Sequence, residues 1–235
     1  MPAGRRTARD ERRARLGQNF LRPELADRFV ESAGVTAGEL VVEIGAGSGA
    51  ITAALARRGA EVLAVELDPV WADRLRRSIG RASRDRVRII AGDFLAVPLP
   101  GRPFRVVACV PFGSTTAILS RLLDDPERRM QRGDVIVQWE VARKRSAVPA
   151  STLRSTAWAP WWEFRLGRRI PAADFRPVPR VDGGVLVVTR RDPPLLPPEM
   201  SARYQAFVRA NWPFGAVATE VPRARQTAKR MRMRP

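Results

Sequence analysis

The stretch ELVVEIGAGSG, residues 39–49, decides the fold of this chain. Its first six residues form a short apolar run typical of a buried strand, and three glycines, Gly45, Gly47 and Gly49, follow at once. The next residues, AITAALARRG (50–59), have the apolar spacing of an amphipathic helix that ends at a glycine. A strand, a glycine-rich turn and a helix in direct succession predict a unit in which the backbone can come close to a bound ligand.

The same alternation of strands and helices continues on both sides of this unit. Continuous apolar strands separated by helices indicate a parallel sheet covered on both faces, and the last two strands are expected to close it as an antiparallel pair. The further strands are expected at 60–67, 87–94, 104–110, 134–141, 161–170 and 184–191, and the further helices at 23–34, 69–79, 114–125 and 201–212.

Three regions are predicted from this pattern. Residues 1–22 form a basic arm, and residues 23–191 form a Rossmann-like α/β domain with a mostly parallel, seven-stranded sheet. Residues 192–235 begin with the proline-rich stretch DPPLLPPEM and continue as a reduced helical and basic tail.

The charge of the 235-residue chain is strongly positive, since 42 Lys and Arg stand against 24 Asp and Glu for a formal net charge of +18. An excess of this size predicts a polyanionic partner, and nucleic acid is the expected one. Both ends of the chain carry part of the excess and are expected to contact phosphates. For any single arginine, a place on a solvated basic surface is the simpler alternative.

The rarest residue types exclude several kinds of chemistry. The chain has no histidine, which excludes a Ser-His-Asp triad and a histidine general base. Its single cysteine, Cys109, cannot form an internal disulfide, so a reducing, cytoplasmic location is expected. No Cys/His cluster suggests a metal site, and no apolar stretch approaches the roughly 20 residues needed to cross a bilayer.

Acidic residues lie near the carboxyl ends of the first three expected strands, and two of them are placed where they can bind a nucleoside. Glu66 lies 21 residues after Gly45, where a carboxylate can accept hydrogen bonds from both ribose hydroxyls, and Asp93 ends the third strand in GDF. The short G-x-G-x-G loop, with Glu43 just before it, differs from the G-x-G-x-x-G loop of nicotinamide enzymes. It resembles the loop of class I methyltransferases, which holds the methionine part of S-adenosyl-L-methionine, so this cofactor is expected.

The fourth expected strand ends in Cys109-Val110-Pro111-Phe112. This resembles the Asn/Asp-x-Pro-aromatic turn of amino-methyltransferases in the same class. An adenine amino nitrogen is a poor nucleophile, and in that turn the Asn oxygen and the next backbone carbonyl accept its two N–H hydrogens. The proline shapes the turn, and the aromatic ring stacks on a base that has been lifted out of its helix.

Six motifs in one order and spacing resemble the Erm family of ribosomal RNA adenine-N6 methyltransferases, relatives of the KsgA-type small-subunit dimethylases. The resemblance spans roughly residues 5–191, and VIVQWEVARK (135–144) and APWWEFRLGRRIP (159–171) look like the actinobacterial Erm type. The motifs are LGQNFL (16–21), VVEIGAGSG (41–49), VELD (65–68), GDF (92–94), VPFG (110–113) and FRPVPRVDGGV (175–185).

The resemblance implies an S-adenosylmethionine-dependent enzyme that methylates adenine 2058 of 23S ribosomal RNA in the nascent large subunit. Such methylation blocks the binding of macrolides, lincosamides and streptogramin B; a monomer is expected. The implied cofactor-binding residues are Gln18, Asn19, Phe20, Glu43, Gly45, Ala46, Gly47, Gly49, Glu66, Leu67, Asp93, Phe94 and Cys109. The implied target-base residues are Cys109, Val110, Pro111, Phe112 and Phe175. The expected RNA-binding residues are Arg5, Arg6, Arg9, Arg12, Arg13, Arg143, Lys144, Arg145, Arg168 and Arg169.

Two departures from the family keep alternatives open. A thiol stands at Cys109 where the family has Asn, and it is a weak donor and a weaker acceptor. The stretch after the linker is also shorter than the family's helical RNA-binding domain. A catalytically impaired homologue that still binds RNA or cofactor is therefore one alternative, and a KsgA-like small-subunit dimethylase is another. The tryptophans Trp158, Trp161 and Trp162 are predicted to pack in the core rather than stack on bases.

Overall fold

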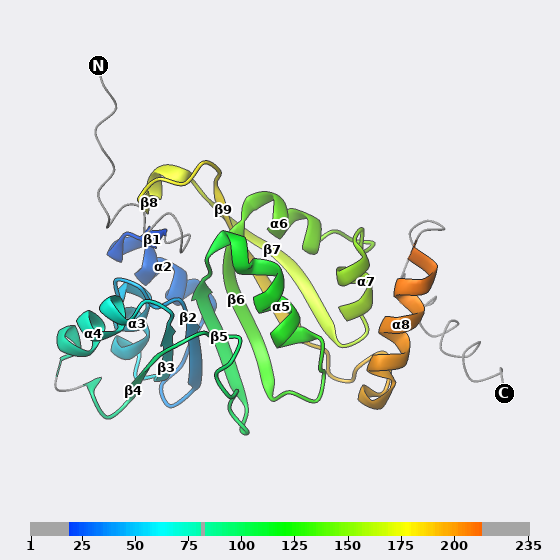
Figure 1. The fold of residues 1–235 in the computed structure, drawn as a ribbon, viewed down its shortest axis with the longest axis horizontal. Coiled ribbons are helices and arrows are strands. Elements are labelled where there is room, and N and C mark those ends of the chain that lie inside the picture. Colours follow the sequence, from blue (N-terminus) through cyan, green and yellow to red (C-terminus); the bar gives the residue numbers. More distant parts are fainter. Residues whose placement is uncertain (1–18, 81–82, 213–235) are drawn as a thin grey trace, which may run out of the picture.

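The computed structural model describes residues 19–80 and 83–212 (Figure 1). None of the helices in these two ranges combines the length and the apolar character needed to span a bilayer. The strands are β1 (Phe20–Leu21), β2 (Leu40–Ile44), β3 (Glu61–Glu66), β4 (Val87–Ala91), β5 (Phe104–Cys109), β6 (Met130–Gln138), β7 (Trp162–Ile170), β8 (Phe175–Arg176) and β9 (Gly183–Arg190). The helices are α2 (Pro23–Ala33), α3 (Ala50–Arg57), α4 (Pro69–Ser78), α5 (Thr115–Leu123), α6 (Trp139–Arg145), α7 (Leu153–Trp158) and α8 (Ser201–Asn211). The short 3₁₀ turns are η2 (Phe112–Ser114), η3 (Ala172–Asp174) and η4 (Pro198–Met200).

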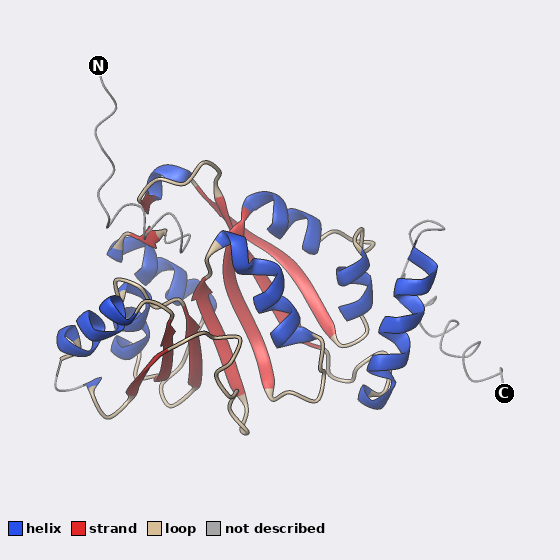
Figure 2. Cartoon of the chain, in the orientation of Figure 1, coloured by secondary structure: helices blue, strands red, loops and turns tan. Residues whose placement is uncertain are grey.

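A seven-stranded sheet forms the centre of the molecule (Figure 2), with the strand order β4-β3-β2-β5-β6-β9-β7. The strands from β4 to β6 are parallel, whereas β9 runs antiparallel to β6 and β7 runs antiparallel to β9. The predicted α/β class and mostly parallel seven-stranded sheet are confirmed, including the closing antiparallel pair. The strand order reverses at β2, which lies between β3 and β5, and such a switch point leaves a crevice at the carboxyl ends of the strands.

Helices cover both faces of this sheet, because apolar side chains alternate along each strand. On one face, Val41 and Val62 pack with α2, α3 and α4. On the other face, Val42 and Val106 pack with α5, α6, α7 and α8. Each helix therefore buries one apolar side and leaves its polar side in solvent.

One strand prediction is wrong at its carboxyl end. The sequence pattern extended a strand over 134–141, but β6 ends at Gln138 and α6 begins at Trp139. The apolar residues of 134–141 are compatible with a strand and with a helix. Where the strand gives way to the helix depends on a long-range contact, in which the backbone N–H of Trp139 donates to the carbonyl of Asp182 at 2.9 Å. The helix α7 and the two-stranded β1–β8 sheet were also not predicted from the sequence.

The segment after residue 191 packs against the same core as the sheet. Leu196, Tyr204 and Val208 are all nearly inaccessible to solvent and belong to the cluster that contains the three tryptophans of 158–162. Those tryptophans are at most 1% exposed, so the predicted packing role is confirmed. The expected domain boundary at 191/192 stays a prediction, and the described packing favours a later one.

Candidate functional site

A pocket opens at the switch point, where β2, β3, β4 and β5 end together. A larger cavity, about 890 Å³, lies at the opposite ends of the central strands and contains no residue of the six family motifs. No three Asp, Glu or Cys side chains of the described ranges gather in a way that could hold a metal ion. The switch-point pocket is lined by Asn19, Phe20, Ile44, Gly45, Val65, Glu66, Leu67, Gly92, Asp93, Phe94, Leu95, Cys109, Pro111, Ser114 and Ile118.

The glycine loop needs its glycines for two different reasons. Gly45, Gly47 and Gly49 all have positive φ, at 74°, 52° and 83°, where a side chain is strained. A Cβ on Gly47 would lie 2.4 Å from the ring of Phe20, so this glycine lets Phe20 cover the loop. A Cβ on Gly49 would lie 2.4 Å from a methyl carbon of Leu75, so Gly49 permits close packing of α3 against α4 and does not line the pocket.

Glu66 connects the glycine loop to the start of α4. Its Oε2 accepts a hydrogen bond from the Gly47 N–H at 2.7 Å, and its Oε1 accepts one from the Asp68 N–H at 2.8 Å. Burial raises the pKa of Glu66, while the backbone hydrogen bonds from Asp68 and Gly47 oppose this rise. The carboxylate is therefore held in place at the end of β3, where ribose hydroxyls can donate to it.

Glu43 lies beneath the loop rather than in the pocket. The hydroxyl of Thr52, on α3, donates to Glu43 Oε2 at 2.6 Å, and the carboxyl group is 1% exposed. Burial raises the pKa of Glu43 to about 8, although the hydrogen bond from Thr52 acts in the opposite direction. At neutral pH this group is mostly protonated, so it supports the loop without adding a full negative charge.

The carboxyl end of β4 presents an acid and an apolar side chain to solvent. Asp93 Oδ1 accepts the Leu95 N–H at 2.9 Å, which orients the carboxylate, and Asp93 is exposed. Leu67 is 52% exposed and Leu95 39% exposed at the same pocket, whereas Phe94 is buried in the core. Two exposed apolar side chains beside an exposed acid suit a flat base with an amino group.

The turn after β5 brings the thiol of Cys109 and the ring of Pro111 to the pocket, whereas neither Phe112 nor Phe175 lines it. Cys109 is partly buried, and its Sγ lies 3.7 Å from the backbone oxygen of Asn19. Burial raises the pKa of Cys109 to about 12, and Glu43, which is ionised at such a high pH, adds to this, so at neutral pH the group is a neutral thiol. The half-buried ring of Phe112 meets the buried ring of Phe175 edge to face at 6.2 Å, so Phe175 supports Phe112 from below.

The expected RNA-binding residues of the described ranges lie in different surroundings. Arg143 and Lys144 are exposed on α6, where Arg143 pairs with Glu140. Arg145 donates to Thr152 at 2.7 Å and stacks over Trp158, and Arg169 pairs with Asp182 and stacks over Trp139, whereas Arg168 is exposed. Gln18 and the arginines at 5, 6, 9, 12 and 13 lie outside the described residues.

Sequence reasoning missed part of the pocket wall. Leu95, Ser114 and Ile118 line it but belong to no quoted motif. Each follows a motif directly or by one helical turn, since Leu95 comes after GDF and the other two lie on the first turns after VPFG. This short distance from a motif is the sequence feature that could have identified Leu95, Ser114 and Ile118 as pocket residues. Ala46, Val110 and Gly47 lie next to the pocket without lining it.

The chain's own residues fit S-adenosylmethionine in shape and in donor chemistry. The loop keeps backbone close to the pocket, Glu66 offers acceptor oxygens, and Asp93 offers another beside exposed apolar side chains. A model of the ribosomal RNA adenine dimethylase family matches residues 9–212. This chain belongs to that family. The resemblance to its Erm branch is confirmed as well, by the relatives described next.

Among relatives of this adenine dimethylase family, the mycinamicin-resistance protein MyrB of Micromonospora griseorubida is 43% identical over 198 residues, which are 84% of this chain and 62% of MyrB. An rRNA adenine N-6-methyltransferase of Corynebacterium diphtheriae is 40% identical over 82% of this chain and 74% of its own length. The crystal structure of the 23S rRNA methyltransferase ErmE matches with a TM-score of 0.73 at 28% identity, covering 92% of this chain and 85% of ErmE. A dimethyladenosine transferase from Plasmodium falciparum shares the fold, with a TM-score of 0.67 at 16% identity. The chain thus spans about three-fifths of the length of MyrB.

Proposed function

We propose that this chain transfers a methyl group from S-adenosylmethionine to the exocyclic amino group of an adenine in 23S ribosomal RNA, with adenine 2058 as the target. The observation that carries the proposal is the single pocket that joins the glycine loop, Glu66 and Asp93 to the turn ending in Phe112. The names of MyrB and ErmE support 23S RNA and resistance to macrolides as the biological setting.

In this proposal the cofactor side of the pocket works by binding and orientation. Glu66 accepts hydrogen bonds from the ribose, Asp93 accepts one from the adenine amino group, and the loop at Gly45 admits the methionine part. S-adenosylmethionine, when bound, supplies a methyl group on a positively charged sulfur. Asn19 and Phe20 line the same pocket, and Phe20 lies over Gly47, so these residues limit the access of water to the reacting atoms.

The target side works by stacking and by hydrogen-bond acceptance. The ring of Phe112, supported by Phe175, stacks on the extruded adenine. The Val110 carbonyl accepts one N6 hydrogen, which directs the nitrogen lone pair toward the methyl group. As the new N–C bond would form, the bond between the methyl group and sulfur would break, leaving a neutral thioether and a positively charged nitrogen. The nitrogen would then lose its proton to water, since the chain has no histidine to receive it. No tuned general base is needed for a proton this acidic.

The thiol at 109 favours a second candidate function, a slow or inactive homologue that still binds cofactor and RNA. A neutral thiol accepts hydrogen bonds poorly, and the high pKa of Cys109 keeps it neutral. Loss of one well-placed acceptor typically lowers a rate by a factor on the order of 10²–10³. The same pKa argues against Cys109 as a methyl-accepting nucleophile, which requires a thiolate.

The test compares methyl transfer to 23S and 16S ribosomal RNA, at saturating cofactor, by the wild type and by Cys109→Asn. We expect primer extension to stop at adenine 2058 of 23S RNA alone, and the Asn variant to react about 10²-fold faster. Cys109→Ser is the matched control, because it restores a polar group but not a carbonyl oxygen. Modification of 16S RNA instead would indicate the small-subunit alternative. No modification by either protein, with cofactor binding intact, would refute the activity and favour the second candidate.

A further inference from the structure

A groove lies between α2 and β7, on the sheet face opposite α5 and α7. Its floor is apolar and consists of Phe29 on α2, Ile170 at the end of β7, and Val185 and Val187 on β9. No helix of the described ranges contributes to this groove except α2, so the sheet face between α2 and the edge strand stays open. The register of β7 shifts between Leu166 and Arg169, and Gly167 within this shift leaves room for Val185, since a Cβ at 167 would lie 2.9 Å from the Cβ of Val185.

Four arginines line the groove, and three of them, on two different elements, have no acidic partner within the described residues, whereas Arg132 pairs with Asp134. Arg28 projects from α2, and Arg165 and Arg168 from β7. Trp162 and Phe164 pack into the other face of the sheet, so alternation places Arg165 on the α2 side. The register shift between Leu166 and Arg169 brings Arg168 to that same side. All three are exposed, and none forms an ion pair or hydrogen bond with another residue of the described ranges.

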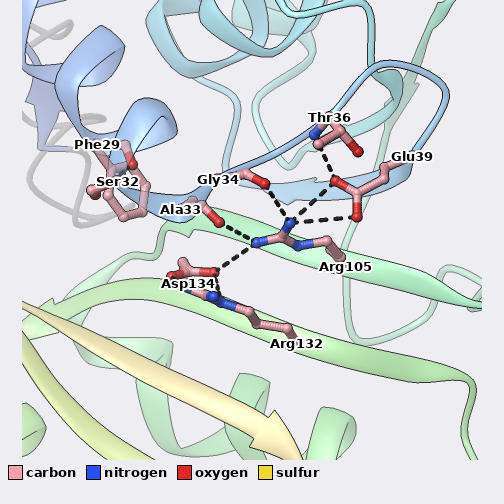
Figure 3. A network of polar contacts seen from close by, with 9 residues as sticks. All are labelled: Phe29, Ser32, Ala33, Gly34, Thr36, Glu39, Arg105, Arg132 and Asp134. Carbon is pink, nitrogen blue, oxygen red and sulfur yellow. Dashed lines mark hydrogen bonds and ion pairs between the residues drawn. The ribbon is translucent and has the colours of Figure 1, made fainter.

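The acidic groups around the groove do not neutralise these arginines. Asp134, at the lower end, is buried and accepts two hydrogen bonds of 2.8 Å from Arg132, with Arg105 on its other side. Figure 3 shows this end, where the clamped Asp134 lies beneath the Phe29 and Ser32 side of α2. Asp174 lines the groove as well, at the η3 turn. Among the described acidic residues lining the groove, Asp174 is therefore the one that has no arginine partner there, and it stands against three guanidinium groups without an acidic partner.

The upper end of the groove leads to the target-base turn. Asp174 comes directly before β8, whose Phe175 lies under the ring of Phe112. β8 pairs with β1, whose Phe20 lines the cofactor pocket. A polymer lying along the groove would thus reach the pocket where the proposed reaction takes place.

We propose that the α2–β7 groove binds the sugar–phosphate backbone of the RNA strand next to the target adenine. Arg28, Arg165 and Arg168 contact phosphates through their planar, two-pronged guanidinium groups, and the apolar floor contacts ribose or base faces. This inference rests on the proposed RNA substrate and adds where the strand runs. RNA is favoured over an acidic peptide by the net charge of +18 and by the continuity of the groove with the target-base turn.

The test replaces the three arginines together with glutamine, in Arg28→Gln/Arg165→Gln/Arg168→Gln, in the full chain. The matched control, Arg77→Gln/Arg84→Gln/Arg88→Gln, removes the same charge from exposed arginines around β4, at the other edge of the sheet. Binding to a 23S RNA fragment that contains the target hairpin is measured by fluorescence anisotropy at several salt concentrations, and cofactor binding is measured in parallel. We expect the groove variant to bind RNA at least about tenfold more weakly, with a salt slope less steep by about 2, and the control to stay within about threefold of wild type. Cofactor affinity should not change.

A cross-linking experiment identifies the occupant directly. Ser32 lines the groove on α2 and is exposed, so Ser32→Cys can carry a benzophenone label, and labelled wild type corrects for reaction at Cys109. With isolated 23S RNA and with large ribosomal subunits, we expect cross-links to nucleotides next to the target adenine. Cross-links to ribosomal protein alone would assign the groove to a peptide, and equal losses in the two triple variants would show nonspecific attraction; either result overturns the inference. Because binding is measured apart from methyl transfer, an inactive wild type would refute the proposed function and leave this test intact.

Discussion

Glu43 shows how one buried side chain can support the cofactor loop and still oppose folding at neutral pH. It sits under the glycine loop with Thr52 as its hydrogen-bond donor and almost no contact with water. Since burial raises its pKa to about 8 from a usual value of 4.5, the folded chain keeps a proton that the unfolded chain has already released. The free energy of unfolding therefore contains a part that depends on pH.

The variant Glu43→Gln should reveal that part. The favourable contribution of the neutral carboxyl is fully present below about pH 4.5 and is lost as the pH rises toward 8, because the native state binds more protons than the unfolded state in this window. Glutamine keeps an oxygen for Thr52 and has no proton to lose. The stability of the variant relative to wild type should rise by roughly 1–3 kcal/mol between pH 5 and pH 8, measured by urea unfolding. The exposed Glu127→Gln is the control for removal of a carboxyl group, and a difference between Glu43→Gln and wild type that stays constant with pH would contradict this.

At the level of elements, a largely buried ionic cluster joins α2 to the strands β5 and β6 and to Glu39, just before β2 (Figure 3). Arg105 of β5 donates to the carbonyls of Ala33 and Gly34 at the end of α2, and pairs with Glu39 at 3.1 Å. It also contacts Asp134 of β6 at 3.4 Å, and Arg132 holds the other side of that carboxylate. The carbonyls at a helix end need donors, and here one guanidinium group supplies them while fixing the helix over the sheet.

Asp134→Ala should destabilise the fold by about 3 kcal/mol or more, since it leaves two arginines without their shared, buried partner. The exposed pair of Asp27 with Arg57 provides the comparison, and Asp27→Ala should cost less than about 1 kcal/mol. Urea unfolding of both variants measures the two values. Similar small losses in both would show that the cluster at Asp134 contributes no more than a surface ion pair.

At the scale of the whole molecule, the segment that follows β9 packs against the sheet and completes its hydrophobic core. The indole N–H of Trp161 donates to the carbonyl of Leu196 at 2.8 Å, and Tyr204 packs edge to face on the same ring at 5.8 Å. Tyr204 and Val208 are 1% and 0% exposed. We infer from these contacts that α8 folds together with the α/β domain.

Tyr204→Ala tests this inference, because it removes a buried ring from the contact between α8 and the sheet. We expect a loss of about 3–5 kcal/mol in the free energy of unfolding, in a single transition followed by tryptophan fluorescence and by circular dichroism. Arg209→Ala, on the exposed side of the same helix, should change the value by less than about 0.5 kcal/mol. A separate early transition for α8, or a loss below 1 kcal/mol, would support a boundary at residue 191 instead.

The sequence by itself determined the order along the chain of the seven strands of the main sheet and of the helices α2, α3, α4, α5 and α8, and the position of the cofactor loop. The strand–glycine–helix unit at 39–59 is recognisable because apolar periodicity and positive φ at glycine are local properties. For the same reason Glu66, Asp93 and the turn at 109–112 could be placed at strand ends, and the parallel arrangement brought these ends together. Every one of these predictions depends on a few neighbouring residues and on one rule about sheets.

Only the tertiary structure decided which of these residues face the pocket and which support it. Gly49 serves the packing of Leu75, Glu43 lies beneath the loop, and Phe175 lies under Phe112, because each of these contacts joins residues far apart in the sequence. The start of α6, the β1–β8 pair and the arginine-bordered groove depend in the same way on elements that meet only after folding. Local patterns carry no information about such long-range contacts, and the burial that these contacts create sets the pKa of Glu43 and the neutral state of Cys109.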